Sequence, residues 1–243
     1  MTASIKRTEL KRLLSKRGIA SRTKASTLIF AGKVKVNGKI VKDPNAYVSI
    51  DSKLVVDQQQ VEVGNQQKIL ICFNKPKNVV TTSSDEQGRK TVYDLLPEKY
   101  KKLKAVGRLD MATTGLLLFT NDNDLANYLL DPNNQIPRTY VVTVKGSPSD
   151  QSISLLQKGI KDQNEILKAK CVELRKSSNK ESILIITLSE GKNREIRRMC
   201  KAVGHEVIKL KRISFGSIEL GDLQPGGVKV VDLEDLKSWM VNK

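Results

Sequence analysis

The sequence predicts an α+β protein built from two unequal domains. Two helix-like segments and an Asn-Gly hairpin signal fall within residues 1–56, and a polar, Gln-rich stretch at 57–67 has the composition of a linker. In residues 68–243, strand-like runs outnumber helices, and hairpins mix with helices irregularly, which favours a mixed sheet over regular β-α-β winding. At 243 residues, the chain is long enough to bury a substantial core.

The first domain begins with two helices that carry recognisable ends. Thr8 is placed to cap the first helix and Ser21 the second. Each helix has three apolar residues at helical spacing and a glycine after it, which are Leu10, Leu13, Leu14 and Gly18 in the first and Ala25, Leu28, Ile29 and Gly32 in the second. Residues 34–41 then alternate around Asn37-Gly38, which predicts a tight hairpin.

The second domain shows apolar, β-branched runs separated by shorter helical patterns. Strands are expected at 68–73, 116–120, 140–145, 182–188 and 207–211, and helices at 124–130, 149–158, 193–203 and 233–240. Neither a Gly-rich phosphate loop nor a dinucleotide fingerprint occurs, which argues against kinase, NTPase and Rossmann functions.

The charge balance predicts a polyanionic partner. Forty-three Lys and Arg residues against 26 Asp and Glu give a formal charge of +17, and RNA or DNA is the usual partner of such a chain. The alternative for the basic first domain is a merely solvated face, but only Glu9 and Asp43 offset its cations up to residue 50. With no apolar run long enough to span a membrane and no paired cysteines, we expect a cytoplasmic protein without a membrane partner.

A tight turn at Gly107-Arg108-Leu109-Asp110 places one carboxylate and one guanidinium between two strand-like segments. An Asx-turn or cap is the simplest role for a loop aspartate, and composition alone favours it over catalysis. Two other segments add to the chemistry. Tyr140 heads a β-branched strand, and Arg197 flanks the apolar stripe of the helix expected at 193–203. A guanidinium at that margin is costly to bury without a carboxylate, and Asp110 would be a suitable partner.

The first domain, with its segments at 7–14, 18–22 and 32–38, resembles the S4 RNA-binding domain, whose two-helix face and hairpin grip structured RNA. The resemblance implies RNA contact by Arg7, Lys11, Arg12, Ser21, Arg22, Lys33, Asn37 and Lys39.

The turn, the tyrosine strand and the Arg-rich helix, in this order behind an S4-like domain, resemble RsuA/RluB-type pseudouridine synthases across essentially the whole chain. By this resemblance, Asp110 is the essential aspartate, Arg197 its basic partner and Tyr140 the aromatic that stacks on the target base. Arg108 lies where the family contacts RNA at the flipped-out nucleotide. Helical spacing places Arg194, Arg198 and Lys201 toward the solvent or RNA side, and we expect Arg194 and Arg198 to contact RNA.

The implied function is conversion of a specific uridine in ribosomal RNA to pseudouridine, with large-subunit RNA favoured over small-subunit RNA. This isomerisation involves neither redox change nor net hydrolysis, so we expect no cofactor and no metal, and a monomer that binds ribosomal RNA. The alternatives are a non-catalytic RNA-binding or ribosome-assembly factor and, less favoured, a hydrolytic enzyme. The latter would need a second carboxylate or a metal cluster that the sequence does not supply.

Overall fold

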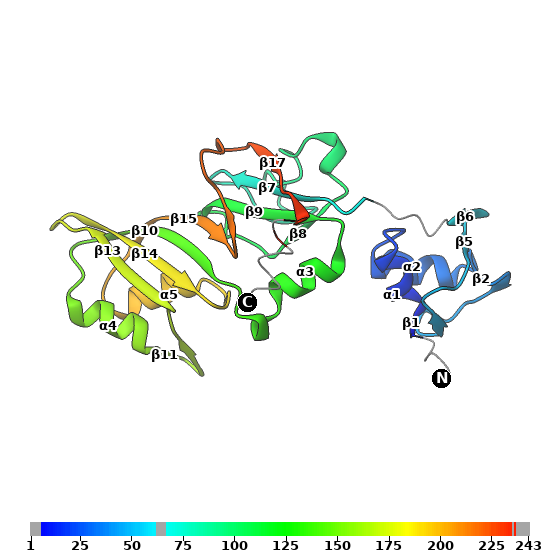
Figure 1. Ribbon diagram of the computed structural model, residues 1–243, viewed down its shortest axis with the longest axis horizontal. Coiled ribbons are helices and arrows are strands. Elements are labelled where there is room, and N and C mark those ends of the chain that lie inside the picture. Colours follow the sequence, from blue (N-terminus) through cyan, green and yellow to red (C-terminus); the bar gives the residue numbers. More distant parts are fainter. Residues whose placement is uncertain (1–5, 62–66, 235, 237–243) are drawn as a thin grey trace. The chain divides into compact units, whose positions relative to one another are not determined.

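A computed structural model of the protein describes residues 6–61, 67–234 and 236 (Figure 1). The chain divides into two compact units, Met1–Gln67 and Lys68–Lys243. The combination of a small N-terminal unit and a larger unit with a mixed sheet confirms the α+β fold class. Each unit is described by itself below.

The N-terminal unit packs two helices against a small sheet. Helix α1 (Leu10–Lys16) and helix α2 (Arg22–Phe30) bury their apolar faces in one core with the strands. The four-stranded sheet has the order β3-β2-β5-β6, made of β2 (Val34–Val36), β3 (Lys39–Ile40), β5 (Leu54–Val56) and β6 (Gln59–Val61). A separate pair joins β1 (Arg7–Glu9) to β4 (Tyr47–Ser49).

Two local expectations for this unit are confirmed and two are corrected. Ser21 caps α2 by accepting a hydrogen bond from the Lys24 backbone N–H, and β2 pairs with β3 around a turn in which Asn37 has a φ of 49°. Thr8 does not cap α1, because it lies in β1 opposite Val48. The stretch expected as a linker from residue 57 also begins too early, since β6 pairs with β5 inside the sheet.

The C-terminal unit is built on a nine-stranded mixed sheet. The main path runs β13-β14-β10-β15-β9-β7-β17, with β16 attached to β15 and β8 attached to β9. All neighbours are antiparallel except β15 and β9. The strands are β7 (Leu70–Lys75), β8 (Lys104–Val106), β9 (Thr114–Thr120), β10 (Arg138–Lys145), β13 (Cys171–Lys176), β14 (Glu181–Leu188), β15 (Val207–Phe215), β16 (Ile218–Glu219) and β17 (Val228–Val230).

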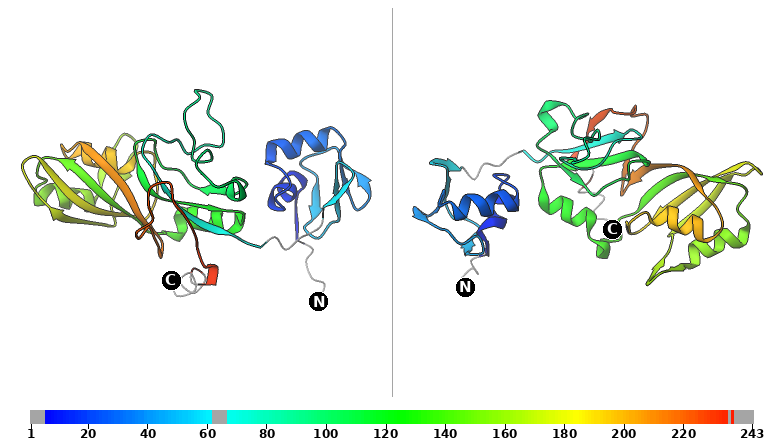
Figure 2. Two further views of the ribbon diagram at one scale, coloured as in Figure 1. Left: turned by 90° about the horizontal axis from the view of Figure 1, so that it is seen from above. Right: turned by 180° about the vertical axis from the view of Figure 1, so that it is seen from behind.

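Helices cover both faces of this sheet (Figures 1 and 2). Helix α4 (Asp150–Lys158) and helix α5 (Glu195–Ala202) contribute to the same core as Val142 and Val144 of β10. Helix α3 (Asn123–Leu130) packs in a second core with the alternate residues of β7 and β9. The central strands are therefore buried on both sides, which explains why β9 reads as a continuous apolar run.

Smaller elements complete the unit. A two-stranded sheet joins β11 (Ile160–Asp162) to β12 (Glu165–Leu167), and two short 3-10 helices span Glu98–Tyr100 and Pro132–Asn134. The helix expected at 233–240 falls largely outside the described residues. In the part of the chain that is described, no helix has the length and apolar character required to traverse a bilayer.

Candidate functional site

Asp110 lies in the turn that connects β8 to β9. Gly107, with a φ of 75°, lets the chain leave β8 in a left-handed conformation, and Thr113 N–H closes the turn on the Asp110 carbonyl at 3.0 Å. Leu109 is buried beneath the turn, whereas the Asp110 side chain remains 32% exposed. The turn therefore presents its carboxylate on a fixed backbone.

Lys75 and Thr81 anchor the backbone of this turn through hydrogen bonds. The ammonium of Lys75, which is completely buried, donates to the Thr113 carbonyl at 2.8 Å and to the Met111 carbonyl at 3.4 Å. The Thr81 hydroxyl donates to the Leu109 carbonyl at 2.9 Å and accepts from the Leu109 N–H at 3.3 Å. Burial lowers the pKa of Lys75 to about 8, although the negative charge of Asp110 opposes the shift. The residues on both sides of Asp110 are thus anchored.

The Asp110 pocket is a cavity of about 270 Å³ that opens above this turn, and Arg108, Asp110, Tyr140 and Arg194 are among the residues that line it. Tyr140 is 7% exposed and belongs to β10. The pairing of β10 with β15 shifts register between Thr139 and Tyr140. Such a bulge locally re-aims side chains, and here it adjoins the tyrosine that forms part of the pocket wall. The structure therefore brings the predicted carboxylate and aromatic residue together.

The ion pair at Asp110 differs from the expected one. Arg194 Nη1 lies 3.6 Å from Asp110 Oδ2, whereas Arg197 Nη1 donates to the Val207 carbonyl at 3.1 Å. The reason is that Arg194 precedes the first residue of α5 in a left-handed conformation, with a φ of 48°, and its side chain reaches the turn. Burial lowers the pKa of Arg197, the nearby Arg194 cation adds to that shift, and the Asp110 charge opposes it. The expected pairing of Arg197 with Asp110 is thus replaced by Arg194.

Two further arginines of the pocket wall were not predicted as site residues. Arg138 and Arg212 are almost completely buried, and both guanidinium groups lie over the Phe215 ring, at 4.7 and 5.1 Å from its centroid. Arg138 donates to the Leu129 carbonyl at 3.1 Å, and Arg212 donates to the Leu116 carbonyl at 2.7 Å. Burial lowers the pKa of Arg138. These cations give the pocket a positive wall.

Glu195 lines the same pocket as Asp110 and Glu190 and was not predicted as a site residue either. It is 3% exposed, because it precedes Ile196 on the buried side of α5. One carboxylate oxygen accepts from the Lys192 N–H at 3.0 Å, and the other has no hydrogen-bond partner among the described residues. Burial raises the pKa of Glu195 to about 7, against an ordinary value of 4.5.

The raised pKa of Glu195 predicts a pH-dependent loss of stability. Since the folded protein holds this proton more tightly than the unfolded chain does, the Glu195 contribution falls as pH rises from 4.5 to 7. We expect Glu195→Gln to gain on the order of 3 kcal/mol in unfolding free energy relative to wild type across that window. Urea titrations at several pH values measure this difference. Parallel pH profiles for the two proteins would contradict it.

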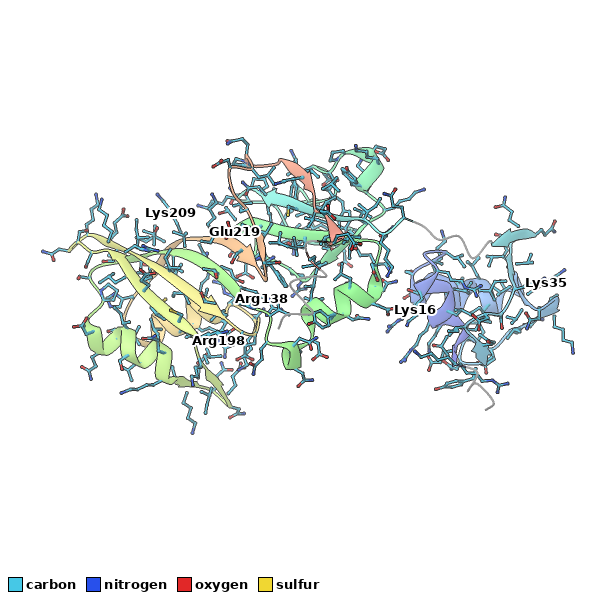
Figure 3. The ribbon with its side chains drawn as sticks, viewed as in Figure 1. Lys16, Lys35, Arg138, Arg198, Lys209 and Glu219 are labelled. Atoms are coloured by element: carbon cyan, nitrogen blue, oxygen red, sulfur yellow. The ribbon has the colours of Figure 1, made fainter. Side chains whose placement is uncertain are left out.

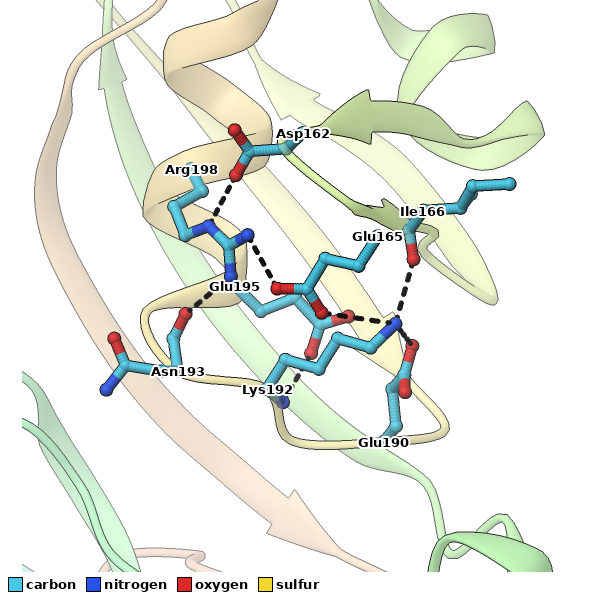
Figure 4. A network of polar contacts seen from close by, with 8 residues as sticks. All are labelled: Asp162, Glu165, Ile166, Glu190, Lys192, Asn193, Glu195 and Arg198. Carbon is cyan, nitrogen blue, oxygen red and sulfur yellow. Dashed lines mark hydrogen bonds and ion pairs between the residues drawn. The ribbon is translucent and has the colours of Figure 1, made fainter.

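Arg198 lies in a network of polar contacts within the C-terminal unit (Figure 4). Its guanidinium binds the carboxylates of Asp162 and Glu165 at the β11–β12 hairpin, the latter at 2.7 Å, and the Asn193 carbonyl at 3.2 Å. Lys192 joins the same network through Glu165, at 3.8 Å, and also pairs with Glu190 at 2.7 Å. These contacts tie α5 to the hairpin, and the RNA contact expected of Arg198 stays a prediction. Figure 3 places Arg198 and Arg138 in the same unit.

The residues expected to bind RNA in the N-terminal unit fall into two groups. In the first group, the side chains already have partners within the unit. Arg12 pairs with Glu9 and Lys33 with Asp57, each at 3.0 Å, and Lys11 binds Asn45 and Glu9. Asn37 accepts a hydrogen bond from the Lys53 N–H, and Ser21 caps α2. Arg7, Arg22 and Lys39 are exposed and lie outside these contacts. Lys16 and Lys35, labelled in Figure 3, add to the positive charge.

Comparison with known proteins places this geometry in a family. The model of the RNA pseudouridylate synthase family matches residues 69–202, and that of the S4 domain matches residues 10–51. Ribosomal large subunit pseudouridine synthase B of Bacillus subtilis is 38% identical over 231 residues, covering 94% of this chain and 93% of the relative. The protein of that name from Vibrio cholerae is 35% identical over 94% of this chain and 73% of the relative.

Two more relatives extend the comparison. An uncharacterized RNA pseudouridine synthase of Aquifex aeolicus is 36% identical over 89% of this chain and 87% of its own length. A crystal structure of a pseudouridylate synthase superposes with a TM-score of 0.67, at 24% identity, over 96% of this chain and 99% of the other, which shows the same fold. With a family match over more than half of the chain, the protein belongs to the RNA pseudouridylate synthases, enzymes that isomerise uridine in RNA, and carries an S4 domain ahead of its synthase domain.

Proposed function

We propose that this enzyme converts a specific uridine of large-subunit ribosomal RNA to pseudouridine, with Asp110 as its essential carboxylate. The similarity to synthases named for the large ribosomal subunit, along almost the full length of both chains, supports the choice of substrate. The observation that carries the role of Asp110 is its position, because its carboxylate and the Tyr140 ring line one small pocket with two buried arginines in the wall.

The proposed roles follow from the chemistry of the isomerisation. The N1–C1′ bond breaks, the uracil turns, and C5 bonds to C1′ and later loses its proton. Asp110 supplies the reacting carboxylate, whether it attacks the base, attacks the sugar or removes a sugar proton. Tyr140 holds the uracil by stacking while it is detached, and Arg194 supplies positive charge beside the Asp110 carboxylate. Arg108, which is exposed at the pocket edge, contacts the RNA where the nucleotide leaves its stack.

Mapping of pseudouridine in both ribosomal RNAs tests the substrate. Cells that lack the protein should lose a modification in large-subunit RNA, and the purified enzyme should restore it on unmodified transcripts. Loss of a small-subunit modification instead would overturn the large-subunit assignment. If neither RNA changed in cells or in vitro, the ribosomal substrate itself would be refuted.

Exposed cations of the N-terminal unit should set the salt dependence of RNA binding. Neutralising phosphates releases counterions, and each contact adds about 0.7 to 0.9 to the slope of log affinity against log salt. We expect the combined substitutions Arg22→Gln, Lys35→Gln and Lys39→Gln to lower that slope by about 2 units and to leave the fold intact. Filter binding of large-subunit RNA at several salt concentrations measures the slope, and an unchanged slope would contradict the prediction.

A further inference from the structure

A second, strongly basic cavity of about 500 Å³ lies along α5. Its wall combines Arg194, Arg197 and Lys201 with the turn at residues 204–207 that leads into β15. The spacing of four residues places Arg197 and Lys201 on one face of the helix, and Arg194 precedes its first turn. We call this cavity the α5 pocket. It is built entirely within the C-terminal unit.

The charges of the α5 pocket are unbalanced. Three cations line it, of which Arg194 also pairs with Asp110 at 3.6 Å, and Glu206 is the sole carboxylate among the lining residues. Burial lowers the pKa of Arg197, the Arg194 cation adds to that shift, and the Asp110 charge opposes it. The buried Nε of Arg197 also has no hydrogen-bond partner among the described residues. Clustering like charges in a hollow costs free energy, which a bound anion would recover.

Two further polar groups of the pocket, the His205 ring and the Val207 carbonyl, already have hydrogen-bond partners. His205 Nδ1 donates to the Lys145 carbonyl at 2.9 Å, since a carbonyl can only accept, and the Val207 carbonyl is taken by Arg197. Lys201 is exposed and free to reach a ligand. The pocket therefore offers an anion the exposed ammonium of Lys201 beside the guanidinium of Arg197, which the Val207 carbonyl holds in place. This arrangement suits phosphate oxygens.

Arg194 connects the α5 pocket to the Asp110 pocket, because it lines both. A nucleotide whose base enters the Asp110 pocket carries phosphates on either side of its ribose, so a neighbouring anion site is where the backbone would pass. We propose that the α5 pocket binds a backbone phosphate of the substrate RNA next to the uridine held in the Asp110 pocket. The inference rests on the proposed function, which supplies the RNA.

Two substitutions test the α5 pocket, one that removes a positive charge and one that removes a negative charge. With a large-subunit RNA fragment that contains the mapped target uridine, Lys201→Gln should weaken binding roughly fivefold and lower the salt slope by about 0.7 to 0.9, whereas Glu206→Gln should tighten binding. The matched controls are Lys180→Gln and Glu181→Gln, on exposed residues of the β13–β14 hairpin. If Lys201→Gln and Glu206→Gln matched these controls in affinity and slope, the proposal would be overturned.

Neutralising single phosphates locates the contact. A methylphosphonate at one of the two positions that flank the target uridine should weaken binding by wild-type enzyme but add little to Lys201→Gln, because the two changes remove the same interaction. Fully additive losses at both positions would contradict the site. Affinity is measured apart from conversion, so a failure to modify ribosomal RNA would refute the proposed function, while equality with the controls would refute the α5 pocket alone.

Discussion

Asp110→Asn should abolish pseudouridine formation while leaving RNA binding and folding intact. Asparagine keeps the size of the side chain and its place on a turn that Lys75 and Thr81 anchor through the backbone. It removes the carboxylate that acts as nucleophile at the base or the sugar, or as base toward a sugar proton, in the three routes considered above. Loss of such a group costs on the order of 10³-fold or more in turnover. Single-turnover conversion of large-subunit RNA measures the effect.

The control for this experiment is Asp150→Asn, which alters an exposed aspartate in the first turn of α4. This variant should convert RNA at the wild-type rate, and both variants should show wild-type RNA affinity and unfolding midpoints. Substantial conversion by Asp110→Asn would remove Asp110 from its proposed role. Weakened RNA binding that fully accounted for lost activity would also contradict a catalytic role.

Sequence patterns predicted most of the C-terminal elements because the central strands and amphipathic helices leave strong signals. The apolar run 116–120 became β9, and Ile196, Met199 and Cys200 are buried on α5 as the spacing predicted. The short strands of the N-terminal unit were missed, since β1, β4, β5 and β6 contain three residues each and are too short to show alternation.

The candidate site was predicted in part. Arg108, Asp110, Tyr140 and Arg194 line one pocket, but the ion-pair partner of Asp110 depends on the left-handed cap at the start of α5, which no periodicity reveals. Lys75, Arg138, Arg212 and Glu195 were missed because charged residues are ordinarily assigned to the surface. Burial of the three cations becomes possible where carbonyl groups and aromatic faces meet their charges, and that requires contacts between segments distant in sequence.

The second large effect is expected at Gly115, where β9 pairs in parallel with β15. Gly115 has a φ of 97°, and a Cβ there would lie 2.2 Å from the Arg212 carbonyl oxygen and 2.9 Å from the Arg212 nitrogen. Both obstructing atoms are backbone, so the strands would have to separate. We expect Gly115→Ala to lower the unfolding free energy by at least about 3 kcal/mol and to reduce activity in whatever protein folds, since the Asp110 turn leads directly into this strand.

A glycine of similar conformation isolates the steric part of this cost. Gly204 has a φ of 86°, but a Cβ there would meet nothing within 4 Å, so Gly204→Ala bears only the backbone strain, about 1 to 2 kcal/mol. Denaturant unfolding of the two variants therefore separates strain from collision. Equal losses of unfolding free energy in the two variants would show that β9 and β15 can move apart at little cost. A much larger loss for Gly115→Ala would mean that the close approach of the Arg212 backbone fixes both the strand pairing and the wall of the Asp110 pocket.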